Sequence, residues 1–242
     1  YADSSAVTNG FALSAREAGA EVRLGVNVTG IVLNRGRAVG VETDQGRINA
    51  GAIVLTAGPW IPEFLHSVGA PLPLTWVRHQ VVKLHRPLNK IPTHPIIADT
   101  SNGISFRPDA GDLTLIGIRE DPTDRDTYNQ SVDPSCAADS LEYLVNRYPA
   151  FDEAGWDGGW SGLFTVTPDH HPIIDRVPGI DNLVVGAGFS GHGFKLSPTI
   201  GRGLAELAMH GKSTSIDMSV LRFTRFADDD LLSSAYGASV FA

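Results

Sequence analysis

Two short apolar runs, one toward each end of the chain, constrain the fold more than any other feature. Residues 52–57 read AIVLTA and residues 182–187 read NLVVGA, and a glycine follows each run. Near-continuous apolar runs of this length are typical of strands buried on both faces of a sheet. The long region between them is rich in short β-prone runs and has few helical patterns. We therefore expect the two ends of the chain to share one α/β domain, into which a second, mostly antiparallel sheet is inserted.

The N-terminal region predicts a helix followed by hairpins. Val7, Phe11, Ala15 and Ala18 recur at helical spacing, and Gly19 is a plausible helix end. Turn residues then separate short β-prone runs. Strands are expected at residues 22–24, 29–33, 38–43, 47–50 and 52–57, and a short helix at residues 61–68.

The central region differs from the N-terminal region, because strand patterns recur there at regular intervals. Asp133-Pro134 stands at the entrance of one predicted helix, at residues 136–148. Glycines at 158, 159 and 162 are expected to interrupt the chain before a last short strand at 164–166. The other strands are expected at residues 77–84, 96–99, 104–107 and 113–119, and the domain limits at 1–74, 75–165 and 166–242.

Composition excludes several classes of protein. The chain has 242 residues, a formal net charge of -8 and a sequence pI near 5.4, so no global attraction to nucleic acid or anionic lipid is expected. The charge balance leaves the possibility of a local basic patch open. The single cysteine, Cys136, excludes an intrachain disulfide and a multi-cysteine metal site. We expect a cytoplasmic protein with no membrane partner and, since Tyr1 begins the chain close to a helical pattern, a piece of a longer protein.

The loop after the second apolar run matches G-x-G-x-x-G at Gly186, Gly188 and Gly191. A dinucleotide fingerprint also needs a helix starting at the third glycine, a second strand and an acidic residue about 20 positions on. Here the capping pair Ser197-Pro198 predicts a later helix start, and neither other feature follows. Two interpretations stay open. The loop either lets its backbone and Lys195 approach a flat ligand, or is a plain strand-to-helix connection.

Two other constellations are weaker candidates. Asp169, His170 and His171 are metal-ligand residue types, but neighbouring side chains of a strand point to opposite faces and do not converge on one ion. No metal site is therefore expected. A nucleophilic pair of Ser190 and His192 would need an orienting acid and an oxyanion hole, and the stretch GFSGHG lacks the elbow spacing of G-x-S-x-G.

The stretch GFSGHGFK at residues 188–195 resembles the C-terminal flavin loop of the D-amino-acid oxidase superfamily, most closely that of sarcosine oxidase-like enzymes. Further segments resemble the family in the same order, and together they cover nearly the whole chain. They are residues 18–22 with 26–31, the turn Ala57-Gly58-Pro59-Trp60, the strand 77–80, the hairpin 105–108 with 115–117, residues 167–175 and Arg225-Phe226.

This resemblance implies a fold, a cofactor and roles for named residues. The fold would be the remainder of a Rossmann-like FAD-binding domain, with the substrate-domain sheet inserted and the pyrophosphate-binding N-terminal part absent. Lys195 would hold the substrate carboxylate, and Arg107 and Arg119 are secondary candidates on the substrate side. The residues implied to bind FAD are Val28, Ala57, Gly58, Trp60, Gly188, Phe189, Ser190, Gly191, His192, Gly193, Phe194 and Lys195.

Two departures from the family pattern bear on the chemistry. Many sarcosine oxidases attach the flavin through a cysteine just before the T-P-D segment, and Gly162 stands at that place. Non-covalent FAD is therefore expected. The lysine that activates oxygen in monomeric sarcosine oxidases would fall near Leu115, in a stretch without lysine. Oxidase and dehydrogenase chemistry both stay open.

The sequence thus predicts the C-terminal portion of an FAD-dependent oxidoreductase. It would oxidise the C–N bond of an amino acid or N-methyl amino acid, sarcosine- or glycine-like, by hydride transfer to the flavin. This portion alone is expected to be inactive without the missing region or a partner subunit. The alternative is a non-catalytic fragment or subunit that cannot hold FAD. The exact substrate, the electron acceptor and the oligomeric state stay open.

Overall fold

A computed structural model describes residues 2–99 and 101–233, except for the side chain of Arg119. The helices are α1 (Ser4–Glu17), α2 (Ile61–Ser67), α3 (Pro134–Arg147) and α4 (Gly193–His210), with 3-10 turns η1 (Gly58–Trp60), η2 (Pro149–Glu153), η3 (Ser219–Leu221) and η4 (Phe223–Phe226). The strands are β1 (Val28–Asn34), β2 (Arg37–Thr43), β3 (Ile48–Asn49), β4 (Ile53–Leu55), β5 (Thr75–His85), β6 (Ile97–Asp99), β7 (Ile104–Pro108), β8 (Leu113–Pro122), β9 (Gly155–Val166), β10 (Ile173–Arg176) and β11 (Leu183–Ala187).

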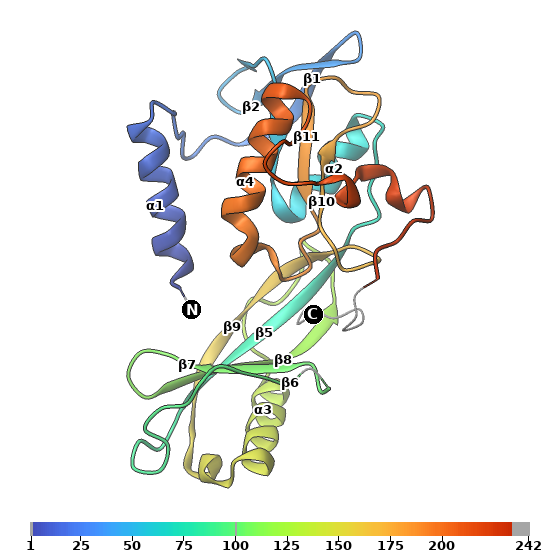
Figure 1. The fold of residues 1–242 in the computed structure, drawn as a ribbon. Coiled ribbons are helices and arrows are strands. Elements are labelled where there is room, and N and C mark those ends of the chain that lie inside the picture. Colours follow the sequence, from blue (N-terminus) through green and yellow to red (C-terminus); the bar gives the residue numbers. More distant parts are fainter. Residues whose placement is uncertain (1, 100, 234–242) are drawn as a thin grey trace.

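The strands form three sheets (Figure 1). Strands β1, β2 and β3 make a small antiparallel sheet, and β10, β11 and β4 make a second one in which β11 and β4 are parallel. The third sheet has the order β6-β7-β8-β5-β9 and is antiparallel throughout. The predicted α/β domain with an inserted antiparallel sheet is therefore confirmed. The inserted sheet runs from Thr75 to Val166, and the exact domain limits stay a prediction.

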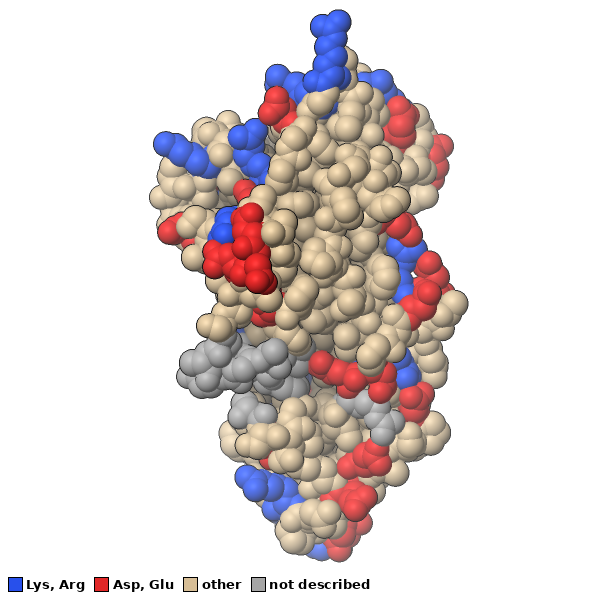
Figure 2. All heavy atoms as spheres, turned by 90° about the vertical axis from the view of Figure 1, so that its right-hand side faces the viewer, with Lys and Arg blue, Asp and Glu red and all other residues tan. Residues whose placement is uncertain are grey.

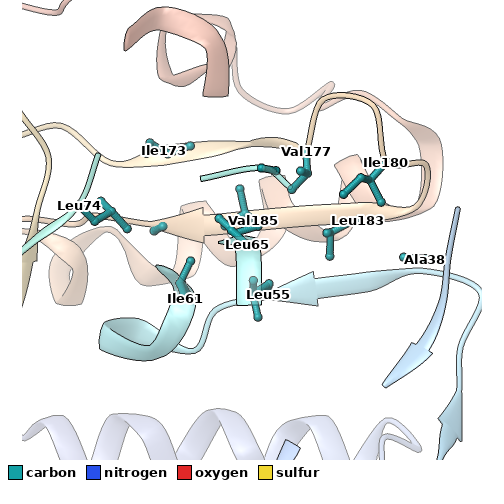
Figure 3. Packing of buried hydrophobic residues seen from close by; sticks show 12 residues of the cluster. Ala38, Leu55, Ile61, Leu65, Leu74, Ile173, Val177, Ile180, Leu183 and Val185 are labelled. Atoms are coloured by element: carbon teal, nitrogen blue, oxygen red, sulfur yellow. The ribbon is translucent and has the colours of Figure 1, made fainter. Parts of the chain in front are cut away.

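The two apolar runs from opposite ends of the chain lie side by side. Leu183 pairs with Ile53 and Val185 with Leu55 in the parallel β4–β11 ladder. Helix α2 packs its buried residues on this pair, as Figure 3 shows for Ile61 and Leu65. On the other face, α4 buries Ile200, Leu204 and Leu207 against β10 and β11. This arrangement holds both apolar runs in one core.

Strand β4 differs from its prediction on one side. Val54 is 41% exposed, whereas all five residues of β11 are buried. The reason is position in the sheet, because β4 pairs only with β11 among the described residues and forms an edge. The expectation that residues 52–57 are buried on both faces is therefore wrong for this chain.

The glycines of the central region do not interrupt the chain as predicted. Strand β9 continues over twelve residues and pairs with β5, with one register shift between the pairs Val82–Gly159 and Leu84–Trp156. At Gly159 a Cβ atom would lie 2.2 Å from the carbonyl oxygen of Val81, so only glycine allows the two strands to approach this closely. The glycine-rich segment is a strand because its backbone pairing, not its side chains, holds it in place.

The N-terminal region shows two further differences. No strand forms at residues 22–24, where Leu24 is 83% exposed. Helix α1 forms as predicted, but it buries none of its residues, and Figure 1 shows it standing apart from the sheets. Its apolar residues, such as Phe11, are exposed because no other described element packs on them.

Strand β5 carries a buried polar network toward α3. The guanidinium of Arg78, 8% exposed, lies 2.7 Å from one carboxylate oxygen of Asp133 and 3.1 Å from the other. The hydrogen bond from Arg78 lowers the pKa of Asp133 despite partial burial. The Asp133 carboxylate also accepts a hydrogen bond from Gln80, and Asp133 stands at the N-terminal end of α3, as Asp133-Pro134 was predicted to. The network ties residues 129–133 to β5.

No helix in residues 2–99 or 101–233 is long and apolar enough to cross a bilayer. Figure 2 shows one face of the molecule, on which most charged side chains lie toward the margins and both signs are interspersed. That face therefore offers no continuous basic surface for a polyanion among the residues shown in colour.

Candidate functional site

Two predicted cofactor segments lie at the same edge of the β10-β11-β4 sheet. Strands β4 and β11 are parallel, so the turn at Ala57-Gly58-Pro59-Trp60 and the loop beginning at Gly188 both leave the sheet at its carboxyl edge. Ligands of open α/β sheets bind at the carboxyl ends of their strands. The fold thus brings together residues that stand more than a hundred positions apart in the sequence.

The glycine-rich loop has an unusual backbone that buried contacts hold. Ser190 is 1% exposed and adopts a φ of 48°, a conformation that side chains rarely take. Its amide donates a hydrogen bond to the carbonyl of Thr165 at 3.0 Å, and its hydroxyl donates to the carbonyl of Gly188 and accepts from the amide of Thr167. Since these backbone contacts occupy the hydroxyl, Ser190 shapes the loop and is not placed as a nucleophile.

Gly188 is the tightest point of the loop. Its φ is 63°, and a Cβ atom would lie 2.4 Å from Cγ2 of Thr167 and 2.8 Å from Cδ2 of Leu74. Both the conformation and the space require glycine at this position. The loop is therefore pressed against the T-P-D segment, which the resemblance had matched separately.

Helix α4 begins earlier than predicted. It starts at Gly193, with His192 as its N-cap, and Pro198 lies inside it. Proline removes the amide that would bond to the carbonyl of Phe194, and the Ser197 hydroxyl donates to that carbonyl at 2.9 Å instead. The pair Ser197-Pro198 therefore continues the helix and does not start it.

The early start of α4 removes one of the three arguments against a dinucleotide-binding motif at Gly186, Gly188 and Gly191. The helix begins two residues after Gly191, so a late helix no longer excludes the motif. The other two arguments, which concern a second strand and an acidic residue about 20 positions on, still apply. In the described residues 211–233 the chain forms only the 3-10 turns η3 and η4 and no second strand, and the position 20 residues past Gly191 is Gly211.

Lys195 lies in the first turn of α4 and is exposed. The first turn holds no acidic residue, so the positive end of the helix dipole is not compensated by its own side chains. The backbone amides of Gly193 and Phe194 belong to the same end. This helix end is a positively polarised surface at the carboxyl edge of the sheet.

A cavity of about 660 Å³ lies beside the turn after β4. Val28, Ala57 and Trp60 line it together with Phe64 of α2. These are three of the residues predicted to bind the cofactor, and the residues 188–195 do not line this cavity. Val28 is 39% and Trp60 53% exposed, which leaves apolar surface available at its wall.

Two contacts hold the turn that carries Trp60. The guanidinium carbon of Arg125 lies 6.0 Å from the centre of its ring, and Arg125 also pairs with Glu63 and Asp126. The neighbouring Pro59 accepts a hydrogen bond at 3.0 Å from the indole of Trp76 at the start of β5. The turn after β4 is thus anchored to the inserted sheet.

Asp169 does not serve a metal site, because its carboxylate is committed to Arg225. Nε and Nη2 of Arg225 donate to the two carboxylate oxygens at 2.7 and 2.9 Å, and both side chains are buried. Burial raises the pKa of Asp169, but the hydrogen bonds from Arg225 and from the amides of His171 and Leu232 outweigh it and lower the pKa to about 2. The pair ties the C-terminal segment to the T-P-D turn beside the glycine-rich loop.

A second cavity of about 210 Å³ lies on the face of the five-stranded sheet that α3 does not cover. Arg107, a predicted substrate-side residue, lines it, with Nη1 3.1 Å from the carboxylate of Asp109. The backbone of Arg119 pairs with Gln80 in β8, but its side chain lies outside the part of the structure that is described. Arg107 is therefore placed at a cavity, and the role of Arg119 stays a prediction.

His79 was missed by the sequence analysis and lines the same cavity. Its ring stacks on Phe164 with centroids 4.8 Å apart and an interplanar angle of 19°. Phe164 adjoins Thr165, whose carbonyl holds Ser190 of the glycine-rich loop. Alternation along β5 could have found His79, since the buried positions 78, 80, 82 and 84 leave 77, 79 and 81 on the other face.

Two positions where the sequence departs from the family pattern can now be located. Leu115 is 5% exposed and pairs with Lys83 across the β5–β8 ladder, so a lysine does lie opposite it, on the neighbouring strand. The ammonium of Lys83 lies 3.0 Å from the carboxylate of Asp157. Gly162 lies in β9 opposite His79, with open space where a Cβ atom would be.

Comparison with known proteins identifies the family. The family model of FAD dependent oxidoreductases matches residues 1–207. Human peroxisomal sarcosine oxidase is 32% identical over 231 residues, which cover 87% of this chain and 56% of that protein. Monomeric sarcosine oxidase of Bacillus sp. strain NS-129 is 31% identical over 211 residues, which cover 78% of this chain and 51% of that protein. The chain thus spans about half the length of these relatives.

A solved structure shares the fold. The crystal structure of L-proline dehydrogenase from P. horikoshii superposes with a TM-score of 0.84 and 26% sequence identity, over 93% of this chain and 60% of that one. The relatives therefore include both oxidases and a dehydrogenase. The match over most of the chain and the shared fold show that this protein belongs to the family of FAD-dependent oxidoreductases that contains the sarcosine oxidases.

Proposed function

We propose that this chain is the C-terminal portion of an enzyme that oxidises the C–N bond of a small amino acid or N-methyl amino acid. The observation that carries the proposal is the shared sheet edge. The turn at residues 57–60 and the start of α4 with Lys195 leave the same edge, next to the cavity that Val28 and Trp60 line. The sarcosine oxidases among the relatives support the substrate class.

The residues at this edge fit a non-covalently bound FAD. The helix N-terminus at Gly193 offers free backbone amides, and the cavity beside Val28, Ala57 and Trp60 has a mixed apolar and polar lining and a volume typical of ligand sites. Bound FAD supplies a hydride acceptor for the substrate. Gly162 offers no side chain for covalent attachment at the family position.

The chain's own groups would bind charge and orient the substrate. Lys195 is exposed in the first turn of α4 and would hold the substrate carboxylate by a charge-assisted hydrogen bond. The uncompensated N-terminus of α4 would stabilise negative charge that develops beside it. On the sheet face, Arg107 and His79 would line the substrate side. These residues would raise the reaction rate mainly by holding the substrate in one orientation.

The region that binds the FAD pyrophosphate would come from a longer chain or from a partner subunit. The extra length of the relatives supports this proposal. The chain by itself would then be inactive. We also propose the cytoplasm as its compartment, because the low cysteine content, Cys136 alone, fits a reducing environment.

The test compares this chain with a longer protein that includes the region encoded upstream of Tyr1. Each is mixed with FAD, freed of unbound FAD and examined for the absorption bands of bound flavin. Bound flavin in the longer protein, bleached by sarcosine, glycine or proline, is the expected result. A longer protein that binds no flavin would overturn the cofactor assignment. Flavin that binds but is reduced by no amino acid or amine would favour the non-catalytic alternative.

A further inference from the structure

A separate cavity of about 320 Å³ lies on the α3 side of the five-stranded sheet. The segment 86–97, which joins β5 to β6, forms one wall, and η2 forms another. Phe106 of β7 forms its floor and belongs to the same buried cluster as α3. His79 and Arg107 line a different cavity, which shares Phe106 alone with this one.

The wall formed by segment 86–97 is fixed by buried polar contacts. Arg86, 5% exposed, donates hydrogen bonds to the carbonyls of Leu113, Gly111 and Pro92, and so ties the segment to the β7–β8 turn. The ring of His94 lies 2.9 Å from the hydroxyl of the fully buried Thr114 and 2.8 Å from the carbonyl of Pro95. A cavity with walls held in this way is formed before any ligand arrives.

Aromatic rings make up much of the lining. The rings of Phe106 and Tyr148 meet edge to face at 5.9 Å, and His94 lies 5.5 Å from Phe106 and 6.2 Å from Phe151. Burial lowers the pKa of His94, so its ring is neutral at neutral pH. Both of its ring nitrogens already face oxygen atoms. The interior therefore offers ring faces and edges, and no charged group.

One positive and two negative side chains meet beside Lys90. Lys90 lines the mouth, and its ammonium lies 2.7 Å from Glu153 and 3.8 Å from Asp152. The hydrogen bond to Glu153 raises the pKa of Lys90, so the lysine stays charged and engaged. A carboxylate ligand would have to compete with two carboxylates that already surround this lysine. The rim therefore disfavours anions.

We propose that this cavity binds an uncharged aromatic molecule of one or two rings. A cavity of about 150 Å³ lined by apolar side chains is sufficient for one benzene ring, and this cavity is about twice as large. Burying a flat apolar ligand among Phe106, Tyr148 and Phe151 would supply the affinity. The inference does not rest on flavin binding, because Phe106 alone among its lining residues also lines the cavity of His79 and Arg107.

The test uses the 242-residue chain and three probes of similar shape: benzyl alcohol, benzylamine and benzoate. Saturation-transfer NMR titrations measure the affinity of each probe, and amide shifts of the ¹⁵N-labelled chain locate it. Benzyl alcohol is expected to bind at least about tenfold more tightly than benzoate, because a carboxylate loses its hydration without gaining a partner. The largest shifts are expected at Ile91, Ile97 and Ala150.

Two variants with matched controls sharpen the test. Ala150→Trp fills the cavity and is expected to weaken benzyl alcohol binding by about tenfold or more, whereas Ala138→Trp on the exposed side of α3 leaves it unchanged. Glu153→Gln frees Lys90 from one carboxylate and is expected to narrow the preference for benzyl alcohol over benzoate. Glu142→Gln, an exposed charge change on α3, does not narrow it.

Several results would overturn the proposal. They are the absence of saturable benzyl alcohol binding, shifts that map to other residues, an Ala150→Trp variant with unchanged affinity, and tighter binding of benzoate or benzylamine than of benzyl alcohol. If Ala150→Trp does not fold, the shift map of the unaltered chain decides the location. Flavin absorption is independent of all these readouts, so failure here leaves the proposed function untouched.

Discussion

Arg225 and Asp169 form a two-pronged ion pair in which the arginine side chain is 0% and the aspartate side chain 1% exposed. The same arginine donates to the carbonyl of His171 at 2.6 Å, and its guanidinium carbon lies 4.2 Å from the centre of the Phe226 ring. Removing one member of such a pair leaves the other charge buried without a partner. The pair joins the C-terminal segment to the T-P-D turn that presses on Gly188.

The first prediction concerns this pair. Arg225→Met should lower the free energy of unfolding by about 3–5 kcal/mol, because the Asp169 carboxylate is left buried and uncompensated. Urea denaturation followed by circular dichroism measures the loss. The double variant Asp169→Asn with Arg225→Met should lose less than the sum of the two single variants. Glu21→Gln, which breaks the exposed pair with Arg23, should leave the midpoint unchanged.

The same pair predicts a dependence on acid pH. The pKa of Asp169 is lowered to about 2 in the folded chain, against about 4 for an unfolded aspartate. The unfolded state therefore binds more protons between these values, and the stability from this group is complete above about pH 4 and lost as the pH falls toward 2. Denaturation midpoints across pH 2–6 should fall less steeply in Asp169→Asn. Equal slopes in both proteins would refute the assignment.

The second prediction concerns the tightest glycine of the glycine-rich loop at residues 188–195. Gly188→Ala should destabilise the chain by about 2–4 kcal/mol, because the left-handed backbone is strained and the new Cβ atom overlaps Thr167. Gly162→Ala is the matched control, since its Cβ atom meets open space and its backbone is ordinary. Thermal denaturation measures the melting temperature of each variant. Similar melting temperatures for both variants would contradict the loop geometry.

The third prediction concerns two histidines whose pKa values are shifted in opposite directions. The hydrogen bond to Asp112 raises the pKa of His85, whereas burial lowers the pKa of His94. In NMR titrations the midpoint of His85 should lie above about 6.5, and that of His94 below it. Asp112→Asn should lower the midpoint of His85 and leave that of His94 unchanged.

The sign of the stability effect follows from these directions. The raised pKa of His85 means that its contribution is fully present below about pH 6.5 and is lost as the pH rises through the raised value. Its side chain is exposed, so salt should reduce the effect. A midpoint for His85 that does not respond to Asp112→Asn would disprove the pairing.

The fourth prediction tests the proposed carboxylate contact in the longer, FAD-containing protein. Lys195→Gln should raise KM for an amino-acid substrate by about 10- to 100-fold, the loss of one hydrogen bond to a charged group, while bound flavin stays at wild-type levels. Steady-state kinetics and the flavin spectrum together measure this. Lys212→Gln, an exposed lysine just after α4, is the control with unchanged KM. An unchanged KM in Lys195→Gln would remove this lysine from the substrate site.

The amino-acid sequence by itself determined the local elements and the family. Helical spacing and Asp133-Pro134 predicted α3 within two residues, and the ordered set of motifs from Ala57-Gly58-Pro59-Trp60 to GFSGHGFK identified the FAD-dependent family. These features are local, because periodicity, caps and turns depend on residues a few positions apart. Short-range signals were wrong where local cues conflicted, as at Pro198 inside α4 and at the glycines inside β9.

Only the tertiary structure decided which distant segments meet. The parallel pairing of β4 with β11, the exposed face of Val54 and the burial of Asp169 against Arg225 all depend on partners far away in the chain. His79 faces a cavity because β5 is covered by α3 on one side only. Such choices come from the packing of whole elements, where burial and hydrogen bonding across long separations outweigh the local preference of any single residue.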